Sequence, residues 1–195
     1  MWPWGHLAVG YIVFTVWSRL ITRNPPSGRT TLVLALATQL PDLVDKSLQF
    51  TLHLYEGRAI AHSLLVMIPF CVGAVLVARQ YGQQQSATAL TIGVITHLFG
   101  DSWRAILTNN VQSEAAYLLW PVLPAPSYAV DAPADHVDRL IAALTEAQGE
   151  SLTDIVGSSM GVQLLLLLLF SVIWLVDGSP GFRTVWRTAV GWLLR

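Results

Sequence analysis

Six histidine and aspartate side chains occur within stretches that are otherwise apolar. An ionisable group at membrane depth is costly, so each is a candidate for a functional role, with pairing inside a helix bundle as the structural alternative. Imidazole nitrogens and carboxylate oxygens suit zinc, manganese or iron, and carboxylates can also bridge two ions. The set therefore predicts a site for one or two divalent ions. Its members are His6, Asp42, Asp45, His62, His97 and Asp101.

Spacing and depth both favour one common site for these side chains. Asp42 and Asp45 are three residues apart, and three residues return a helix to nearly the same face. His97 and Asp101 are four residues apart and share a face for the same reason. Counted at about 1.5 Å per residue, all six candidates lie about 15 to 25 Å above the inner rim of a layer about 30 Å thick.

Two arginines can face the same centre. Arg58 precedes His62 by four residues, and Arg104 follows Asp101 by three. Two guanidinium groups beside a metal are suited to hold an oxyanion such as phosphate. The alternative is that both arginines only neutralise the nearby carboxylates.

Some candidates have structural interpretations that the sequence leaves open. His6 is as consistent with a packed or interfacial histidine as with a metal ligand. Asp42 and Asp45 could instead form an internal ion pair with Lys46, which follows Asp42 by four residues.

The sequence favours a metal-binding role for His97 and not for His53 or His136. His97 and Asp101 could form a buried hydrogen bond, but metal binding is favoured because the other candidates lie at the same depth. His53 and His136 have no partner at ligand spacing, so they are interpreted as surface histidines.

Composition indicates a membrane protein. Of 195 residues, 53% are hydrophobic and 12% are charged, about half the charged fraction of a soluble domain. The formal net charge of -1 argues against nucleic acid as a partner. The one cysteine allows neither an intramolecular disulfide nor a cysteine zinc site. The length predicts a single domain, residues 1–195.

The hydropathy pattern predicts an all-α, polytopic membrane helix bundle of about five spans. The first span is interpreted as retained and not as a signal peptide, because it has no basic leader and no evident cleavage site. The last carries no functional polar group and is expected to anchor and pack. The apolar stretches are residues 4–20, a run from Thr31 that soon meets Pro41 and Asp42, and residues 61–78, 87–107 and 162–176.

Basic residues predict the orientation. Seven of the eleven lysines and arginines fall on one side of the bundle and four on the other. By the positive-inside rule, this places the N-terminus outside and the C-terminus in the cytoplasm of a plasma (inner) membrane, with the site near the outer face. Residues 108–161 would form an extracytoplasmic cap. Its amphipathic helix at 135–147 is expected to pack on the bundle and not to act as a lid. Residues 182–195 would form an interfacial helix.

Short motifs occur in a fixed order over residues 5–121. They are Gly5-His6, Leu40-Pro41-Asp42-Leu43-Val44-Asp45, Arg58-Ala59-Ile60-Ala61-His62-Ser63-Leu64, His97-Leu98-Phe99-Gly100-Asp101-Ser102 and Tyr117-Leu118-Leu119-Trp120-Pro121. This set resembles the YdjM-type membrane-bound metal-dependent hydrolases, described as LexA-binding, inner-membrane-associated hydrolases. That family typically has a His before the arginine and a Thr before the histidine of the third motif, where this chain has Gly57 and Ala61.

The resemblance implies a chemistry. The family is distantly similar to zinc-dependent phospholipases C, whose metals hydrolyse phosphoesters, so zinc and a phosphoester such as a lipid head group are the expected cofactor and substrate. By resemblance, Asp42 or Asp45 bridges metals or activates water, and an arginine, Arg58 or Arg104, steadies the phosphoryl group. The implied metal ligands are His6, His62, His97 and Asp101.

Two other functions stay open from the sequence. One is a non-catalytic, metal-binding structural or regulatory membrane protein. The other is an ion or metal transporter, because charged residues in a membrane also mark permeation paths. Against transport, the inner halves of the spans, such as residues 13–16 and 72–77, offer no continuing polar relay.

Overall fold

In the part of the chain that it describes, the computed structural model consists of helices joined by turns and short irregular segments, with no strand. This part comprises residues 1–52, 57–125, 137–138, 141–142, 145 and 158–193. The expected all-α class is confirmed for these residues. His53, His136 and most of the helix expected at 135–147 lie outside them, so the expectations for these positions stay predictions.

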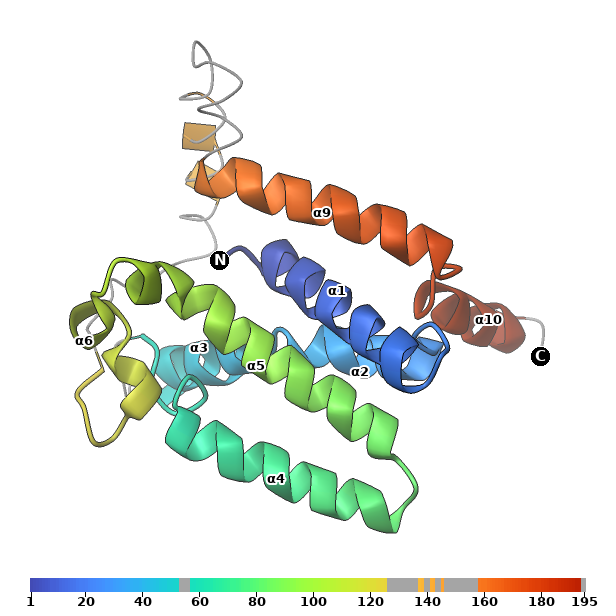
Figure 1. Cartoon of the computed structure of the whole chain (residues 1–195), viewed down its shortest axis with the longest axis horizontal. Coiled ribbons are helices and arrows are strands. Elements are labelled where there is room, and N and C mark those ends of the chain that lie inside the picture. The colour runs from blue at the N-terminus through green and yellow to red at the C-terminus, as the bar shows by residue number, and fades with distance from the viewer. Residues whose placement is uncertain (53–56, 126–136, 139–140, 143–144, 146–157, 194–195) are drawn as a thin grey trace.

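A central helix organises the fold (Figure 1). α5 packs against α1, α2 and α4, and α9 packs on α1. The helices are α1 (Pro3–Ile21), α2 (Gly28–Ala37), α3 (Leu40–Leu52), α4 (Leu64–Gln80), α5 (Gln84–Leu107), α6 (Val111–Glu114), the 3-10 helix η1 (Ala116–Leu119), α9 (Ser159–Val176) and α10 (Phe182–Leu193).

Local sequence explains where several helices begin. The hydroxyls of Ser27, Ser63 and Ser158 accept hydrogen bonds from backbone N–H groups in the first turns of α2, α4 and α9. Serine is a favoured residue at this position because its side chain satisfies an N–H that has no partner within the helix. The cap at Ser63 leaves His62 outside α4, in the segment that precedes the helix.

The second apolar stretch forms two helices where the sequence predicted one span. α2 ends at Ala37 and α3 begins at Leu40, with Pro41 in its first turn. A proline inside a continuous helix would remove one hydrogen bond and clash with the preceding turn, whereas the first turn tolerates it. The break places Asp42 at the start of α3 and leaves the Thr38 carbonyl at the end of α2 open to a partner from another element.

Small residues let α2 approach α5 closely. A Cβ added at Gly93 of α5 would lie 2.6 Å from the Cβ of Ala37 and 3.1 Å from the backbone nitrogen of Thr38. From the other side, a Cβ added at Gly10 of α1 would lie 2.6 Å from a methyl group of Thr38. The end of α2 is therefore held between α1 and α5.

One helix in the described part of the chain is clearly long and apolar enough to cross a membrane. It is α9, with a mean hydropathy of 2.3 over 18 residues, of which 11% are buried. α2 and α4 are apolar but shorter. By length and hydropathy, the expected bundle of five spans is thus not established.

Polar contacts attach both ends of α9 to α1. Asp177, directly after α9, accepts hydrogen bonds from the hydroxyls of Tyr11 (2.8 Å) and Thr15 (2.7 Å) and forms an ion pair with Arg19. At the other end, the Gln163 side-chain oxygen accepts a 2.8 Å hydrogen bond from the N–H of Trp2. These contacts fix the position of the long apolar helix against the bundle.

Replacing Gly93 with alanine should destabilise the protein by about 1–3 kcal/mol, because the new methyl group must displace the end of α2. The thermal unfolding midpoint of the purified protein in detergent measures this. Gly73→Ala on α4 is the matched control: nothing lies within 4 Å of its added Cβ, so it should be neutral or stabilising by about 0.4–1 kcal/mol. Equal midpoints for the two variants would contradict the packing of α2 on α5.

Candidate metal centre

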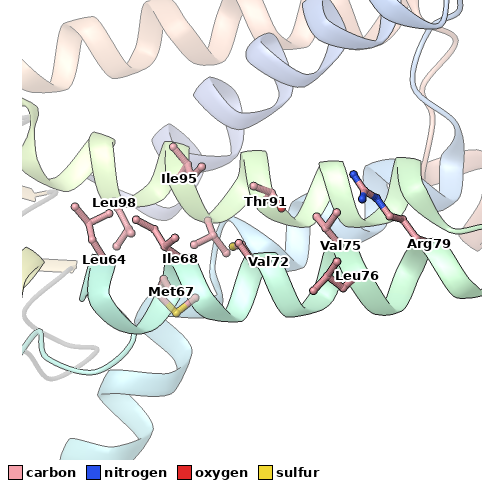
Figure 2. A pocket seen from close by; sticks show the side chains of 12 residues that line it. Leu64, Met67, Ile68, Val72, Val75, Leu76, Arg79, Thr91, Ile95 and Leu98 are labelled. Carbon is pink, nitrogen blue, oxygen red and sulfur yellow. The ribbon is translucent and has the colours of Figure 1, made fainter.

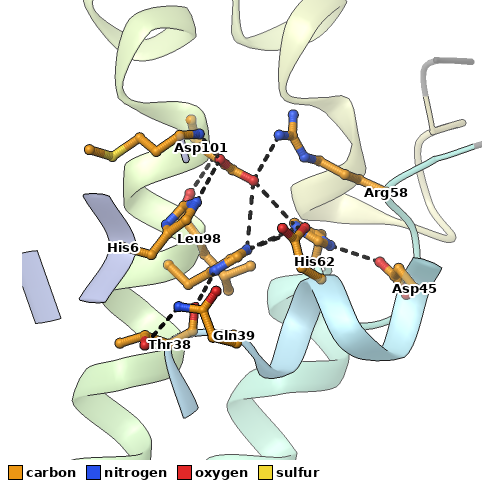
Figure 3. A network of polar contacts seen from close by, with 12 residues as sticks. His6, Thr38, Gln39, Asp45, Arg58, His62, Leu98 and Asp101 are labelled. Carbon is orange, nitrogen blue, oxygen red and sulfur yellow. Dashed lines mark hydrogen bonds and ion pairs between the residues drawn. The ribbon is translucent and has the colours of Figure 1, made fainter. Parts of the chain in front are cut away.

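Histidine and aspartate side chains from three parts of the chain converge on one point. His97 and Asp101 come from α5, Asp42 from the first turn of α3, and His62 from the segment before α4. One ligand atom of each lies within 4.8 Å of the others. Figure 3 shows His62 and Asp101 directed toward each other in this network.

Hydrogen bonds behind the two imidazole rings decide which nitrogen faces the centre. Nδ1 of His97 lies 2.7 Å from the carbonyl oxygen of Thr38, and a carbonyl can only accept, so Nδ1 donates. Nδ1 of His62 lies 2.8 Å from a carboxylate oxygen of Asp45, which likewise accepts. In each neutral ring Nε2 then carries a lone pair. Both lone pairs belong to the atoms that face the centre.

The distances between these atoms fit a bound cation. The two Nε2 atoms are 3.2 Å apart, so their lone pairs repel each other unless a proton or a cation lies between them. Oδ1 of Asp42 lies 3.6 and 3.8 Å from them, and Oδ2 of Asp101 lies 3.5 and 3.6 Å from them. Ligands at about 2.0–2.2 Å from a tetrahedral ion are about 3.3–3.6 Å apart, close to these five distances, and the four ligand atoms as a group lie within 4.8 Å of one another. The donor types and the distances from the two imidazoles therefore suit one divalent ion.

Asp42 combines two roles that the sequence left as alternatives. Its Oδ2 pairs with Lys46 at 3.0 Å, as the i,i+4 spacing allows, while its Oδ1 faces the two histidines. The ion pair with Lys46 holds the carboxylate in place and does not remove it from the centre.

Asp45 lies behind His62 and not among the four converging residues. Oδ2 accepts hydrogen bonds from His62 and from the N–H of Ala59 (2.8 Å), and Oδ1 accepts one from the N–H of Ala61 (2.9 Å). A carboxylate in this position orients a metal-binding histidine and raises its basicity. The structure thus gives Asp45 a positioning role where the sequence predicted a ligand, because His62 stands between this carboxylate and the centre.

His6 lies beside Oδ1 of Asp101, the carboxylate oxygen that does not face the two Nε2 atoms. Its Nε2 is 3.2 Å from Oδ1 of Asp101, which also contacts the amine of Met1 at 2.5 Å, and its ring stacks on His97 with centroids 3.9 Å apart. Both ring nitrogens are buried and form no hydrogen bond of acceptable geometry within the described part of the chain. A buried imidazole without a hydrogen bond can still bind a metal ion together with Asp101. His6 does not, however, belong to the four converging residues.

The structure brings one of the two predicted arginines to the centre. A guanidinium nitrogen of Arg58 lies 2.8 Å from Oδ2 of Asp101, and the guanidinium carbon lies 5.5 Å from the ring centroid of Tyr117. Arg104 is exposed, with its guanidinium over the ring of Trp103 at 5.6 Å. Its three-residue spacing from Asp101 fits one helix face, but the long side chain extends outward, as arginines near helix ends commonly do.

Two groups of the site were missed by the sequence reasoning. One is the carbonyl of Thr38, a backbone group that no side-chain motif can reveal. The proline that follows the apolar run was the sequence signal for it, because it predicts a break in the helix. The other is Tyr117, which is fully buried, stands edge-on to His62 at 5.7 Å and has its hydroxyl 3.1 Å from that of Ser102. It belonged to a matched motif, but no role was assigned to it.

Comparison with known families supports membership of a membrane protein family. A family model described as YdjM inner membrane protein matches residues 1–181, which include the four converging residues, Asp45, Arg58 and His6. No curated protein and no solved structure gives a significant match.

Replacing Asp45 with asparagine should weaken metal binding about 10- to 100-fold, because the carboxylate that orients His62 is lost. Competition between the purified protein and a zinc-chelating dye measures the affinity. Asp177→Asn is the matched control, since it alters an equally buried aspartate that contacts α1; it should lower stability and leave zinc affinity unchanged. Unaltered zinc affinity in the Asp45→Asn variant would contradict the positioning role.

Proposed function

The chain belongs to the YdjM inner membrane protein family, and on this premise we propose that it is a membrane-embedded, metal-dependent hydrolase of phosphoesters. The observation that carries the proposal is the convergence of two imidazole lone pairs and two carboxylate oxygens on one point, with a guanidinium beside them. Family membership itself supports only the membrane localisation. The phosphoester chemistry, with a phospholipid head group as the favoured substrate, is our inference from the donor set and Arg58.

Zinc is the proposed ion. Nitrogen and oxygen donors in a roughly tetrahedral spacing suit zinc, and manganese and iron accept the same ligand types. When bound, such an ion supplies a Lewis acid that activates water and neutralises charge on a phosphoryl oxygen. The four converging residues would hold one ion, and His6 with Asp101 Oδ1 is where a second would bind.

Unequal burial supports catalysis over a purely structural site. Structural metal sites are closed, whereas catalytic sites keep one position open. The side chains of His62, His97 and Asp101 are at most 1% exposed, but those of Asp42 and Arg58 are 18% and 31% exposed. The centre therefore opens on the side of Asp42 and Arg58, and a phosphoester would approach from there.

The proposed roles follow from which atoms are already engaged. Arg58, fixed by Asp101 at 2.8 Å, would orient a phosphoryl oxygen, for which a planar guanidinium is well suited. Asp42 is the more exposed carboxylate: its Oδ1 would hold the ion, and its Oδ2, which pairs with the partly exposed Lys46 at 3.0 Å, would take the proton of the attacking water. Asp45 cannot take this role, because its oxygens accept hydrogen bonds from His62 and from the N–H groups of the loop.

We also propose that the five predicted spans all lie in the bilayer, with the N-terminus outside and the centre near the outer face. α4 has 17 residues and extends about 26 Å, close to the hydrocarbon thickness of about 30 Å. Large apolar side chains are exposed along both α4 and α9, as expected for contact with lipid. They include Leu65, Ile68, Val72, Leu168, Val172 and Leu175.

A second function is a metal-binding structural or regulatory membrane protein. The observation that favours it is that the ligands come from separate elements, so a bound ion would link α3, the segment before α4, and α5. In that case loss of the metal would lower stability and there would be no turnover to lose.

The double variant His97→Ala, Asp101→Ala should lose bound metal and phosphoester hydrolysis together, because it removes half of the converging donors. Elemental mass spectrometry of the purified protein should find about one or two equivalents of metal per unaltered chain and none in the variant. Release of the phosphorylated head group from phospholipid in mixed micelles, with diacylglycerol as the other product, measures the activity. Metal binding without turnover on any phosphoester would favour the structural function, and no metal even after reconstitution would reject both.

Arg58→Lys should reduce kcat/KM for the phosphoester about 10- to 100-fold, since a lysine cannot reproduce the planar hydrogen bonds of a guanidinium to a phosphoryl group. Arg104→Lys is the matched control, because that side chain lies exposed over Trp103, and its kcat/KM should not change. Metal content is measured in both variants, so that a loss of the ion is not mistaken for a loss of substrate binding. Equal kinetics in the two variants would contradict the role of Arg58.

A further inference from the structure

A narrow groove follows the seam between α4 and α5 (Figure 2). Its volume is about 360 Å³. At one end it is lined by Leu64, two residues after His62, and by Leu98, directly after His97; Arg79 lines the other end. The groove therefore begins at the first turn of α4 and next to His97 of α5, beside the metal centre.

The lining of the groove is almost entirely apolar. From α4, Ile68, Val72 and Leu76 recur at four-residue spacing along one helix face, and Ile95 faces them from α5. These four side chains are 52–54% exposed, so the apolar surface is open to its surroundings. The hydroxyl of Thr91 in the lining already donates a 2.9 Å hydrogen bond to the carbonyl of Ala87. Between its ends the groove is therefore suited to bind a hydrocarbon chain.

The length of the groove suits one hydrocarbon chain. The sixteen residues from Leu64 to Arg79 rise about 22 Å, and the groove along them has a volume of about 360 Å³. One leaflet of the hydrocarbon layer is about 15 Å deep, which means that the groove can take a whole acyl chain.

We propose that this groove holds one acyl chain of a lipid whose phosphoester head group reaches the metal centre. The proposal rests on the proposed function and specifies its substrate as a membrane lipid, in place of a water-soluble phosphoester. The head group belongs at the end formed by Leu64 and Leu98, because the converging ligands and Arg58 lie there. Arg79 closes the opposite end, where its stem can run along apolar surface while its charge reaches the far interface.

Photochemical labelling tests the groove directly. The purified protein is mixed with phosphatidylglycerol that carries a diazirine in one acyl chain, in nanodiscs of phosphatidylcholine, then irradiated and analysed by peptide mass spectrometry. We expect the label to concentrate on the α4 and α5 residues that line the groove, above its level on the exposed apolar face of α9.

Two matched substitutions distinguish a site from general lipid contact. Val72→Trp places an indole in the groove and displaces at least two methylene groups, so the label there should fall about tenfold. Val172→Trp on α9 makes the same change at a residue of equal exposure, 52%, and should leave the groove label unchanged. Because both positions are exposed, both variants should fold, and their thermal unfolding midpoints verify this.

Several outcomes would overturn the proposal. One is an even distribution of label over α9 and the groove, and another is a groove label that Val72→Trp does not reduce. Cross-links between two copies of the chain through α4, with the probe excluded, would show that a second copy occupies the groove.

The same labelling separates this proposal from the proposed function. Labelling needs no turnover, so the groove label should persist in the His97→Ala, Asp101→Ala variant. Groove labelling of the unaltered, metal-loaded protein without any hydrolysis would keep the acyl site and reject the hydrolase. Hydrolysis of the lipid with no enrichment of label in the groove would do the reverse.

Discussion

Two imidazole nitrogens that face each other 3.2 Å apart in a buried space set the constraint on which the site depends. Each ring has its other nitrogen bound to an acceptor, so neither Nε2 has a proton of its own to offer while the ring is neutral. Both acceptors can reach the rings because the backbone is not helical at two places, between α2 and α3 and in the segment before α4. The Thr38 carbonyl is available to His97 because α2 stops at Ala37, and Asp45 reaches His62 because the segment before α4 folds back onto α3 through the N–H groups of Ala59 and Ala61. The irregular parts of the backbone thus determine the direction of the ligand atoms.

The same residues connect helix packing to the metal centre. The methyl group of Thr38 lies against α1 at Gly10, and its backbone nitrogen lies against α5 at Gly93. Its carbonyl oxygen accepts the hydrogen bond from the ring of His97. A side chain larger than hydrogen at Gly93 would move the carbonyl that fixes the tautomer of His97, so a change in packing distant from the ligands would reach them through one peptide unit. Because protein interiors are close-packed, such a shift is not absorbed locally.

How far the sequence predicts this protein depends on whether the information is local. The spacing of His97 and Asp101 predicted that they share a face, since a continuous helix carries both. The same rule placed Asp42 and Asp45 on one face of α3, and both contact His62. Asp42 belongs to the four converging residues, whereas Asp45 contacts Nδ1, the nitrogen of His62 on the far side of the ring from the centre. Arg104 also has the expected spacing, but its side chain is exposed and lies over Trp103. The helical class was predictable from hydropathy. The number of spans stays a prediction, because among the described residues α9 is the one helix that is long and apolar enough by itself.

Charge balance in the cluster bears on which substrates it can accept. Asp42, Asp45 and Asp101 carry three negative charges, and the groups that pair with Asp42 and Asp101, the side chains of Lys46 and Arg58 and the amine of Met1, carry three positive charges. These charges balance, so the cluster by itself offers an anionic phosphate no net attraction. A divalent ion among the four converging donors would leave an excess positive charge beside Arg58. In a region of low dielectric an excess charge has a strong preference for a counter-ion, and a phosphodiester, with its single negative charge, is the counter-ion that a membrane lipid supplies. If the centre binds a divalent ion and a lipid head group as proposed, each would stabilise the other, so binding of either should strengthen binding of the other.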